Sequence, residues 1–125
     1  MTPFGEHLRQ LRRARQMTQQ QMAEGIGVSA AYLSALEHGH RGKPSFAFIQ
    51  RLIGFLNIIW DEAEELQRLA ELSDPRVTID TSDLSAGHTE LANLLAQRIG
   101  TLDHEQISAL QGMLGERDSK HGMAD

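Results

Sequence analysis

Residues 17–52 read MTQQQMAEGIGVSAAYLSALEHGHRGKPSFAFIQRL, and this stretch decides the fold. Thr18, followed three residues later by Gln21, forms a helix-capping pattern in which a hydroxyl and an amide each bond a backbone N–H. Gly25-Ile26-Gly27 predicts the end of that helix, because glycine readily adopts the left-handed conformation that terminates helices. Ser29 is expected to cap a second helix. The stretch therefore predicts two short helices joined by a tight turn.

Further helices are predicted on both sides of this pair. Thr2-Pro3 suits a helix start, and apolar residues then recur with helical spacing at Phe4, Leu8 and Leu11. Ser45 is expected to cap a fourth helix, and a fifth is predicted from about Asp61 to Leu72, with Trp60 in the core or at an interface. Residues 1–72 are thus interpreted as a five-helix domain.

The rest of the chain has a different pattern. Ser73-Asp74-Pro75 interrupts the helical pattern, and Val77–Thr81 alternates apolar and polar residues as a short strand does. Two more helices are predicted, from about Thr89 to Ile99 and from Asp103 to Leu114. We expect residues 73–115 to form one region and residues 116–125 to form a flexible tail.

The composition bounds the class of protein. The chain has 125 residues and no cysteine, which excludes disulfides and cysteine-based zinc sites. It has no apolar run near the roughly 20 residues that span a bilayer and no secretory signal pattern, so a soluble, cytoplasmic protein without a membrane partner is expected. Residues 1–60 contain seven bases and three acids, whereas residues 61–125 contain five bases and fourteen acids. A basic first half suits a nucleic-acid partner despite the overall charge of −5.

Five features of the quoted stretch together resemble the Cro and phage-repressor type of helix-turn-helix protein, also called the xenobiotic response element family. They are the Thr-Gln opening, Ala23, Gly27-Val28-Ser29, Glu37-x-Gly39 and Pro44. The resemblance covers about residues 3–72. It implies an all-α, lambda-repressor-like domain that binds double-stranded DNA, with the helix after Ser29 lying in the major groove.

The resemblance also implies roles for single residues. Gln19 corresponds to a phosphate contact, and the loop residues His40, Arg41 and Lys43 correspond to backbone contacts, which give affinity without reading sequence. The base-facing set is Ser29, Ala30, Ala31, Tyr32, Ser34 and Ala35. Alanine cannot form paired hydrogen bonds to a base, so we expect specificity to depend on Tyr32, Ser34, Arg41 and DNA shape.

Arg12 and Glu37 match a family pair that joins the first helix to the end of the third, and their expected role is structural. In the second half, apolar residues are expected either to pack on the first domain or to form a dimer interface. The lone strand favours the dimer, because it can pair with its mate in a second copy. The apolar residues are Val77, Ile79, Leu91, Leu94, Leu95, Ile107, Leu110 and Leu114. A homodimer would read a pseudo-palindromic operator, with repression the expected outcome.

Other classes of function remain open or are disfavoured. His38-x-His40 suggests two metal ligands, but no third ligand is evident nearby, so no metal and no cofactor are expected. No catalytic motif is recognisable, and an enzyme is not expected. The alternative is a protein-interaction module, such as an antitoxin or adaptor whose acidic helices bind a partner protein; an enzyme accessory subunit is a weaker one. The sequence says nothing of a small-molecule effector.

Overall fold

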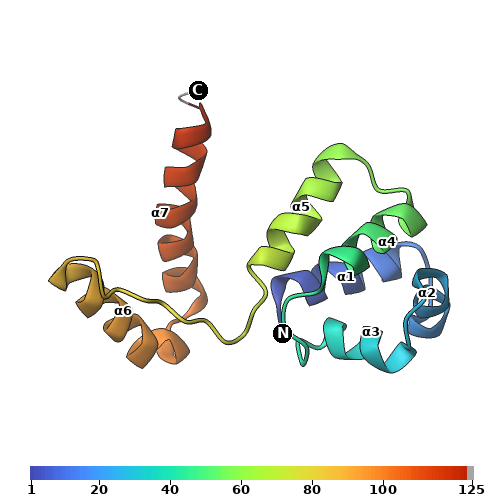
Figure 1. Ribbon diagram of the computed structural model, residues 1–125, viewed down its shortest axis with the longest axis horizontal. Helices are drawn as coiled ribbons and strands as arrows, with labels where there is room; N and C mark the ends of the chain where they lie inside the picture. The colour runs from blue at the N-terminus through green and yellow to red at the C-terminus, as the bar shows by residue number, and fades with distance from the viewer. Residues whose placement is uncertain (124–125) are drawn as a thin grey trace. The chain divides into compact units, whose positions relative to one another are not determined.

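The computed structural model describes residues 1–123, and every regular element in that range is helical (Figure 1). The all-α fold class is therefore confirmed. The helices are α1 (Pro3–Ala14), α2 (Gln19–Ile26), α3 (Ala30–Glu37), α4 (Phe46–Leu56), α5 (Trp60–Glu71), α6 (Ala86–Arg98), the short 3₁₀ helix η1 (Ile99–Thr101) and α7 (His104–Met123). The chain divides into two compact units, residues 1–77 and residues from 78 onward. None of the helices in residues 1–123 is both long and apolar enough to cross a bilayer.

The predicted caps start the helices of the first unit. The Thr2 hydroxyl accepts from the Gly5 amide, and Thr18 and Gln21 form the reciprocal capping box at α2. Ser29 and Ser45 cap α3 and α4 in the same way. Each hydroxyl satisfies a backbone N–H that the helix itself leaves without a partner, and this sets where each helix begins.

Gly27 makes the bend between α2 and α3 possible. Its φ is +89°, and its N–H donates to the Ala23 carbonyl at 2.8 Å. A side chain strains the backbone in this left-handed region, whereas glycine does not. Val28 follows and packs against the core, so the chain can turn at once into α3.

Three sequence expectations differ from the structure. No strand forms at Val77–Thr81 in the single chain, and pairing with a second copy stays a prediction. Trp60 is expected in the core or at an interface; the core placement is wrong, since its side chain is 82% exposed in the single chain, and the interface placement stays a prediction. Helix α6 starts at Ala86, three residues before the predicted start, because Ser85 and His88 form a capping box. The backbone of α7 is helical to Met123; the predicted flexibility of residues 116–125 falls partly outside the described residues and stays a prediction.

The core of the first unit is formed by apolar side chains from all five of its helices and from the segment between α4 and α5. These are Phe4, Leu8, Leu11, Met22, Ala23, Ile26, Leu33, Leu36, Phe48, Ile49, Leu52, Leu56, Ile58, Leu66 and Ala70. Phe4 meets Phe48 edge-on at 6.3 Å between ring centroids. Ser73 closes the unit, because its hydroxyl accepts from the Phe4 amide at 2.9 Å and donates to the Leu69 carbonyl.

Helices α1 and α3 approach so closely that only glycine fits between them. A Cβ atom added at Gly5 would lie 2.3 Å from the Leu36 carbonyl oxygen, which is backbone and cannot swing away. The position of α3 therefore depends on the missing side chain at Gly5.

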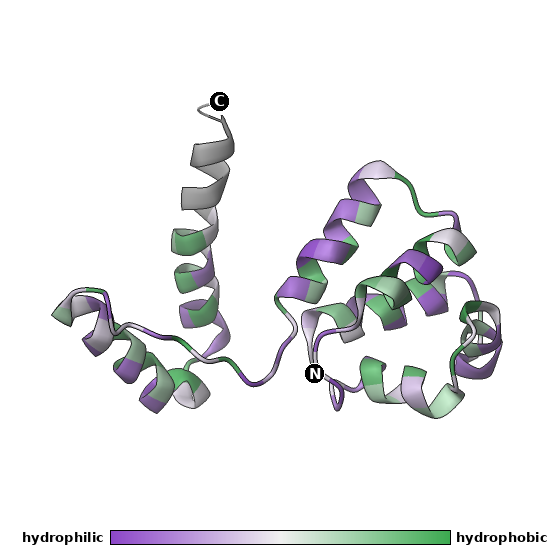
Figure 2. Ribbon diagram, in the orientation of Figure 1, coloured by the Kyte–Doolittle hydropathy of each residue, from purple (hydrophilic) through white to green (hydrophobic). Residues whose placement is uncertain are grey.

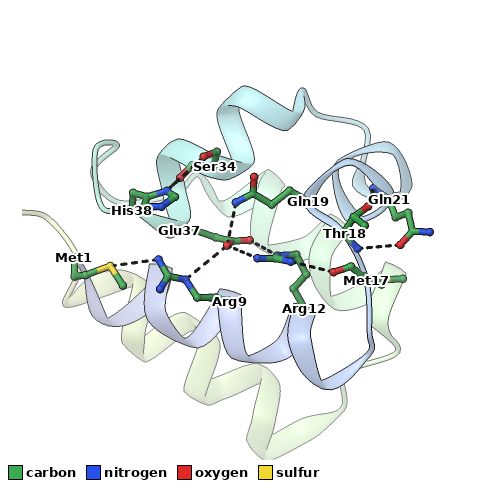
Figure 3. A network of polar contacts seen from close by, with 10 residues as sticks. All are labelled: Met1, Arg9, Arg12, Met17, Thr18, Gln19, Gln21, Ser34, Glu37 and His38. Atoms are coloured by element: carbon green, nitrogen blue, oxygen red, sulfur yellow. Dashed lines mark hydrogen bonds and ion pairs between the residues drawn. The ribbon is translucent and has the colours of Figure 1, made fainter.

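An ion pair fixes the rotation of α3 on α1. Glu37, the last residue of α3, is completely buried, and Arg12 of α1 donates to both carboxylate oxygens at 2.7 and 3.0 Å. Gln19 of α2 donates to the same carboxylate at 3.2 Å, and Arg9 lies 3.9 Å from it. Figure 3 shows these side chains converging on Glu37 from α1 and α2. Arg12 also donates to the Met17 carbonyl, so the pair fastens the α1–α2 turn as well.

The pKa of Glu37 reflects two opposed effects. Burial raises it, but the hydrogen bonds from Arg12 and Gln19 and the nearby guanidinium charges outweigh burial and hold the pKa below its usual value of 4.5. A carboxylate with a lowered pKa stabilises the fold at all pH values above its unfolded pKa. That contribution is lost as the pH falls through the folded pKa.

Replacing Gly5 by Ala should push α3 away from α1 and lower the free energy of unfolding by about 2–3 kcal/mol, as overpacking does. The matched control is Gly54→Ala in α4, where no atom lies within 4 Å of the added Cβ. That change should stabilise the helix by up to about 1 kcal/mol. Urea unfolding followed by circular dichroism measures both. Equal stability of the two variants would contradict the close approach of α1 and α3.

Replacing Arg12 by Met should lower the free energy of unfolding at pH 7 by roughly 3–5 kcal/mol, because it leaves a buried carboxylate without the guanidinium that hydrogen-bonds both of its oxygens. This deficit should shrink as the pH falls from 7 toward 4.5, since protonation removes the buried charge, whereas the native protein loses stability below pH 4.5. Urea unfolding at several pH values measures both slopes. The control, Arg12→Met with Glu37→Gln, has no titrating carboxylate at this site and should show a deficit that does not change between pH 7 and 4.5, where Glu37 of the native protein stays ionised. A pH-independent deficit in the single variant would show that the lost charge is not the cause.

Candidate nucleic-acid interface

The outward face of α3 consists of small side chains. The helix packs on α1 and α2 through Leu33, Leu36 and Glu37, which are buried. On the other side, Ala30 and Ala31 are exposed, and Ser34 and Ala35 are half-buried. The predicted base-facing residues thus lie on the accessible side of the helix, where small side chains allow another surface to approach closely.

Tyr32 lies at the edge of this face and is half-buried. Its ring meets the buried Phe48 ring edge-on, with 5.8 Å between centroids, and its amide is capped by the Ser29 hydroxyl at 3.0 Å. The guanidinium carbon of Arg41 lies 5.6 Å from the centroid of the Tyr32 ring. Tyr32 is therefore part of the packing between α3 and α4 as well as of the surface.

The loop after α3 carries the predicted backbone contacts. His40, Arg41 and Lys43 are all exposed, and the amides of His40 and Arg41 donate to the Ala35 carbonyl at 2.9 and 3.4 Å. These bonds hold the start of the loop against the last turn of α3. Lys43 pairs with Glu71 of α5 at 2.8 Å, but both side chains are largely exposed, and such a pair contributes little to stability. A phosphate can therefore compete with Glu71 for this ammonium group.

The sequence suggests His38 only as a metal ligand, but its side chain also lies beside Ser34 of the α3 face. Its Nδ1 bonds the Ser34 carbonyl at 2.8 Å, and its ring stacks on His40 with 6.1 Å between centroids. The signal was present in the sequence, because His38 follows Ser34 by four residues and so shares its helix face. Within residues 1–123, no cluster of three or more potential metal ligands includes the two histidines.

Gln19 stands at the amino-terminal end of α2. One of its side-chain N–H groups is directed to Glu37, and a primary amide has a second N–H for another acceptor. The ion pair described above therefore also orients the residue predicted to contact phosphate. A helix amino terminus favours an anion at this place.

The residues predicted for dimerisation are not brought together into a core. Val77, Ile79, Leu91, Leu94, Ile107, Leu110 and Leu114 are 38–73% exposed, and Leu95 is half-buried. Figure 2 shows apolar segments along α6 and along the first turns of α7. Between residues 78 and 115 no side chain is buried, so these residues form no core of their own in the single chain.

A family model described as a helix-turn-helix domain matches residues 3–66. In Bacillus subtilis (strain 168), the uncharacterized HTH-type transcriptional regulator RghRB is 44% identical over 61 residues, which are 49% of this chain and 44% of that protein. The HTH-type transcriptional repressor RghR is 46% identical over 61 residues, 49% of this chain and 45% of that protein. The similarity thus spans less than half the length of these curated relatives.

A solved complex of the SinR protein with the SinI protein contains a chain with a TM-score of 0.45 and 20% identity, over 93% of this chain and 98% of that one. The match of the family model to half of the sequence decides the family. It agrees with the helix pair α2–α3 and with the capping and turn residues that form it. The chain belongs to the helix-turn-helix domain family, and the predicted resemblance to the Cro and phage-repressor type is confirmed.

Proposed function

We propose that this protein is a sequence-specific DNA-binding transcriptional regulator that inserts α3 into the major groove. The accessible, small-residue face of α3, held outward by the buried Arg12–Glu37 pair, is the observation that carries the proposal. A major groove about 12 Å wide admits an α-helix. Alanines at the centre of the face let the helix backbone come close to the bases and can contact thymine methyl groups.

The charge distribution supports the same partner. Residues 1–60 carry a net charge of +4, and the loop cations Arg41 and Lys43 lie exposed after α3, next to the exposed His40. Cations beside an inserted helix neutralise phosphates and release counterions, which gives salt-dependent affinity for any duplex. Gln19 at the start of α2 is suited to a further phosphate.

A homodimer is the assembly we propose for this function. The second unit leaves large apolar side chains on α6 and α7 in water, and covering one such side chain contributes about 1.5–3 kcal/mol. A second copy of the same unit can cover this face in a twofold arrangement, with the Val77–Thr81 segments paired. Two copies of α3 placed about 34–36 Å apart would then read the two halves of a pseudo-palindromic operator.

Repression is the regulatory outcome we propose, because the name of the relative RghR describes that protein as a repressor. A dimer seated on a promoter excludes polymerase without any further activity. The alternative is a protein-interaction module, favoured by the net charge of −9 in residues 61–125 and by the same exposed apolar residues. That module would be monomeric alone and would form a complex only with a partner protein.

Replacing Ala31 by Leu should abolish sequence-specific binding, because a larger side chain at the centre of the α3 face keeps the helix away from the bases. The duplex is first obtained by selection from a random-sequence DNA library, and affinity is measured by fluorescence anisotropy. We expect at least a tenfold loss with an unchanged melting temperature. Ala14→Leu, at an exposed alanine of α1, is the matched control and should bind like the native protein. Native affinity of the Ala31 variant would rule out α3 as the reading helix.

Replacing Leu94 of α6 and Leu110 of α7 by Asp should convert a dimer into a monomer, because charges in an apolar interface lose their hydration. Light scattering after gel filtration measures the mass directly. The control is Gln97→Asp, which adds a charge to α6 at an exposed polar residue. A native protein that is monomeric without DNA and dimerises only with another protein would favour the interaction module.

A further inference from the structure

The centre of the α3 face lacks a side chain that can recognise a base by paired hydrogen bonds. Ala30, Ala31 and Ala35 have no polar atom, and the Ser34 hydroxyl lies 3.4 Å from His38 Nδ1. Paired donors are supplied in proteins mainly by arginine, which matches the O6 and N7 atoms of guanine. The donor must therefore come from a residue beside the helix.

Both the backbone and the side chain of Arg41 contact α3 at this edge. Its amide donates to the Ala35 carbonyl at 3.4 Å, next to the shorter bond from His40. Its guanidinium carbon lies 5.6 Å from the centroid of the Tyr32 ring, within the range of a cation–π contact. The guanidinium thus lies over the Tyr32 ring of α3, and the residue stays exposed to a partner.

Tyr32 is a fixed platform for this guanidinium. Its ring is held edge-on against Phe48, which is 1% exposed and itself packs on Phe4. A platform joined to the core restricts the arginine before any partner arrives, so less side-chain freedom is lost on binding. Lys43, by contrast, is engaged by Glu71 and has no aromatic neighbour in the contacts that the structure gives for it.

We propose that Arg41 reads a guanine at the edge of each half-site, and that Tyr32 is the positioning residue that presents it. This proposal rests on the proposed function and deepens it by naming the residue that determines specificity. The guanidinium plane offers two parallel N–H donors, and an ammonium group offers a point charge without that geometry. Lysine at position 41 would therefore keep attraction to DNA and lose the discrimination between bases.

The test compares Arg41→Ala, Arg41→Lys and Lys43→Ala on the selected duplex, on the same duplex with each guanine replaced, and on an unrelated duplex. Arg41→Ala and Arg41→Lys should each lose roughly tenfold to a hundredfold in affinity for the selected duplex. Their affinity for the unrelated duplex should change much less. For these two variants, replacing one guanine per half-site should no longer lower the affinity for the selected duplex. Lys43→Ala should weaken binding to all duplexes by the same factor and reduce the salt dependence.

Tyr32→Phe and Tyr32→Leu test the platform. The phenyl ring keeps the cation–π contact, so Tyr32→Phe should keep native discrimination, whereas Tyr32→Leu should lose part of it. In an Arg41→Ala background, the change to Leu should have no further effect on discrimination. Melting temperatures of all variants are measured beside binding, and Tyr32→Phe is informative even if the leucine variant unfolds.

Several outcomes would overturn the inference. Equal losses on selected and unrelated duplexes would make Arg41 a phosphate contact, and full discrimination by Arg41→Lys would exclude paired hydrogen bonds to guanine. In both cases the proposed function stands as long as Ala31→Leu abolishes specific binding. If the native protein selects no duplex from the library, the proposed function itself fails, and the inference fails with it.

Discussion

The buried contact between Arg12 and Glu37 is the constraint on which the rest of the first unit depends. A carboxylate without access to water is costly unless it is paired, so α3 can pack on α1 only in the rotation that brings Glu37 to the guanidinium. Because a helix rotates by about 100° per residue, this packing also determines which residues of α3 face outward, and these include Ala31 and Ala35. The same carboxylate accepts a bond from Gln19, so α2 is aligned by the contact that orients α3.

Under the proposed function, this constraint separates two tasks that a recognition helix would otherwise combine. The centre of the α3 face is reduced to alanine, and a small centre allows close approach but provides no base recognition. Polar groups are found at the rim of the face: the guanidinium of Arg41, which lies over Tyr32, and the ring of His38, whose Nδ1 donates to the Ser34 carbonyl. Both rim residues are attached to α3 by bonds to its own carbonyls. Such an arrangement requires that the residues after α3 keep a fixed position on the helix. The hydrogen bonds to the Ala35 and Ser34 carbonyls hold them there.

Most of the first unit could be predicted from the sequence because its signals are local. The hydroxyl caps at Thr18, Ser29 and Ser45, and the glycine at position 27, act on backbone groups within three or four residues. The start of α6 was missed, because His88 takes the capping position that glutamine or glutamate usually occupies. The contact between Arg41 and the Tyr32 ring depends on how the loop folds back over α3 and on the position of Phe48. Neither could be predicted from the spacing of residues in the sequence.

The two units differ in how they achieve stability, and under the proposed function this difference would link assembly to DNA binding. The first unit closes its own core with five helices, whereas residues 78–115 bury no side chain in the single chain. A segment that buries no side chain on its own becomes more stable when a partner binds and covers its apolar residues, and the gain grows with the concentration of the partner. If that partner is a second copy, the joined recognition helices bind two half-sites at a high effective concentration, and the affinity rises without any new contact to DNA. Linkage then requires the converse, because a duplex that binds two copies also stabilises their association.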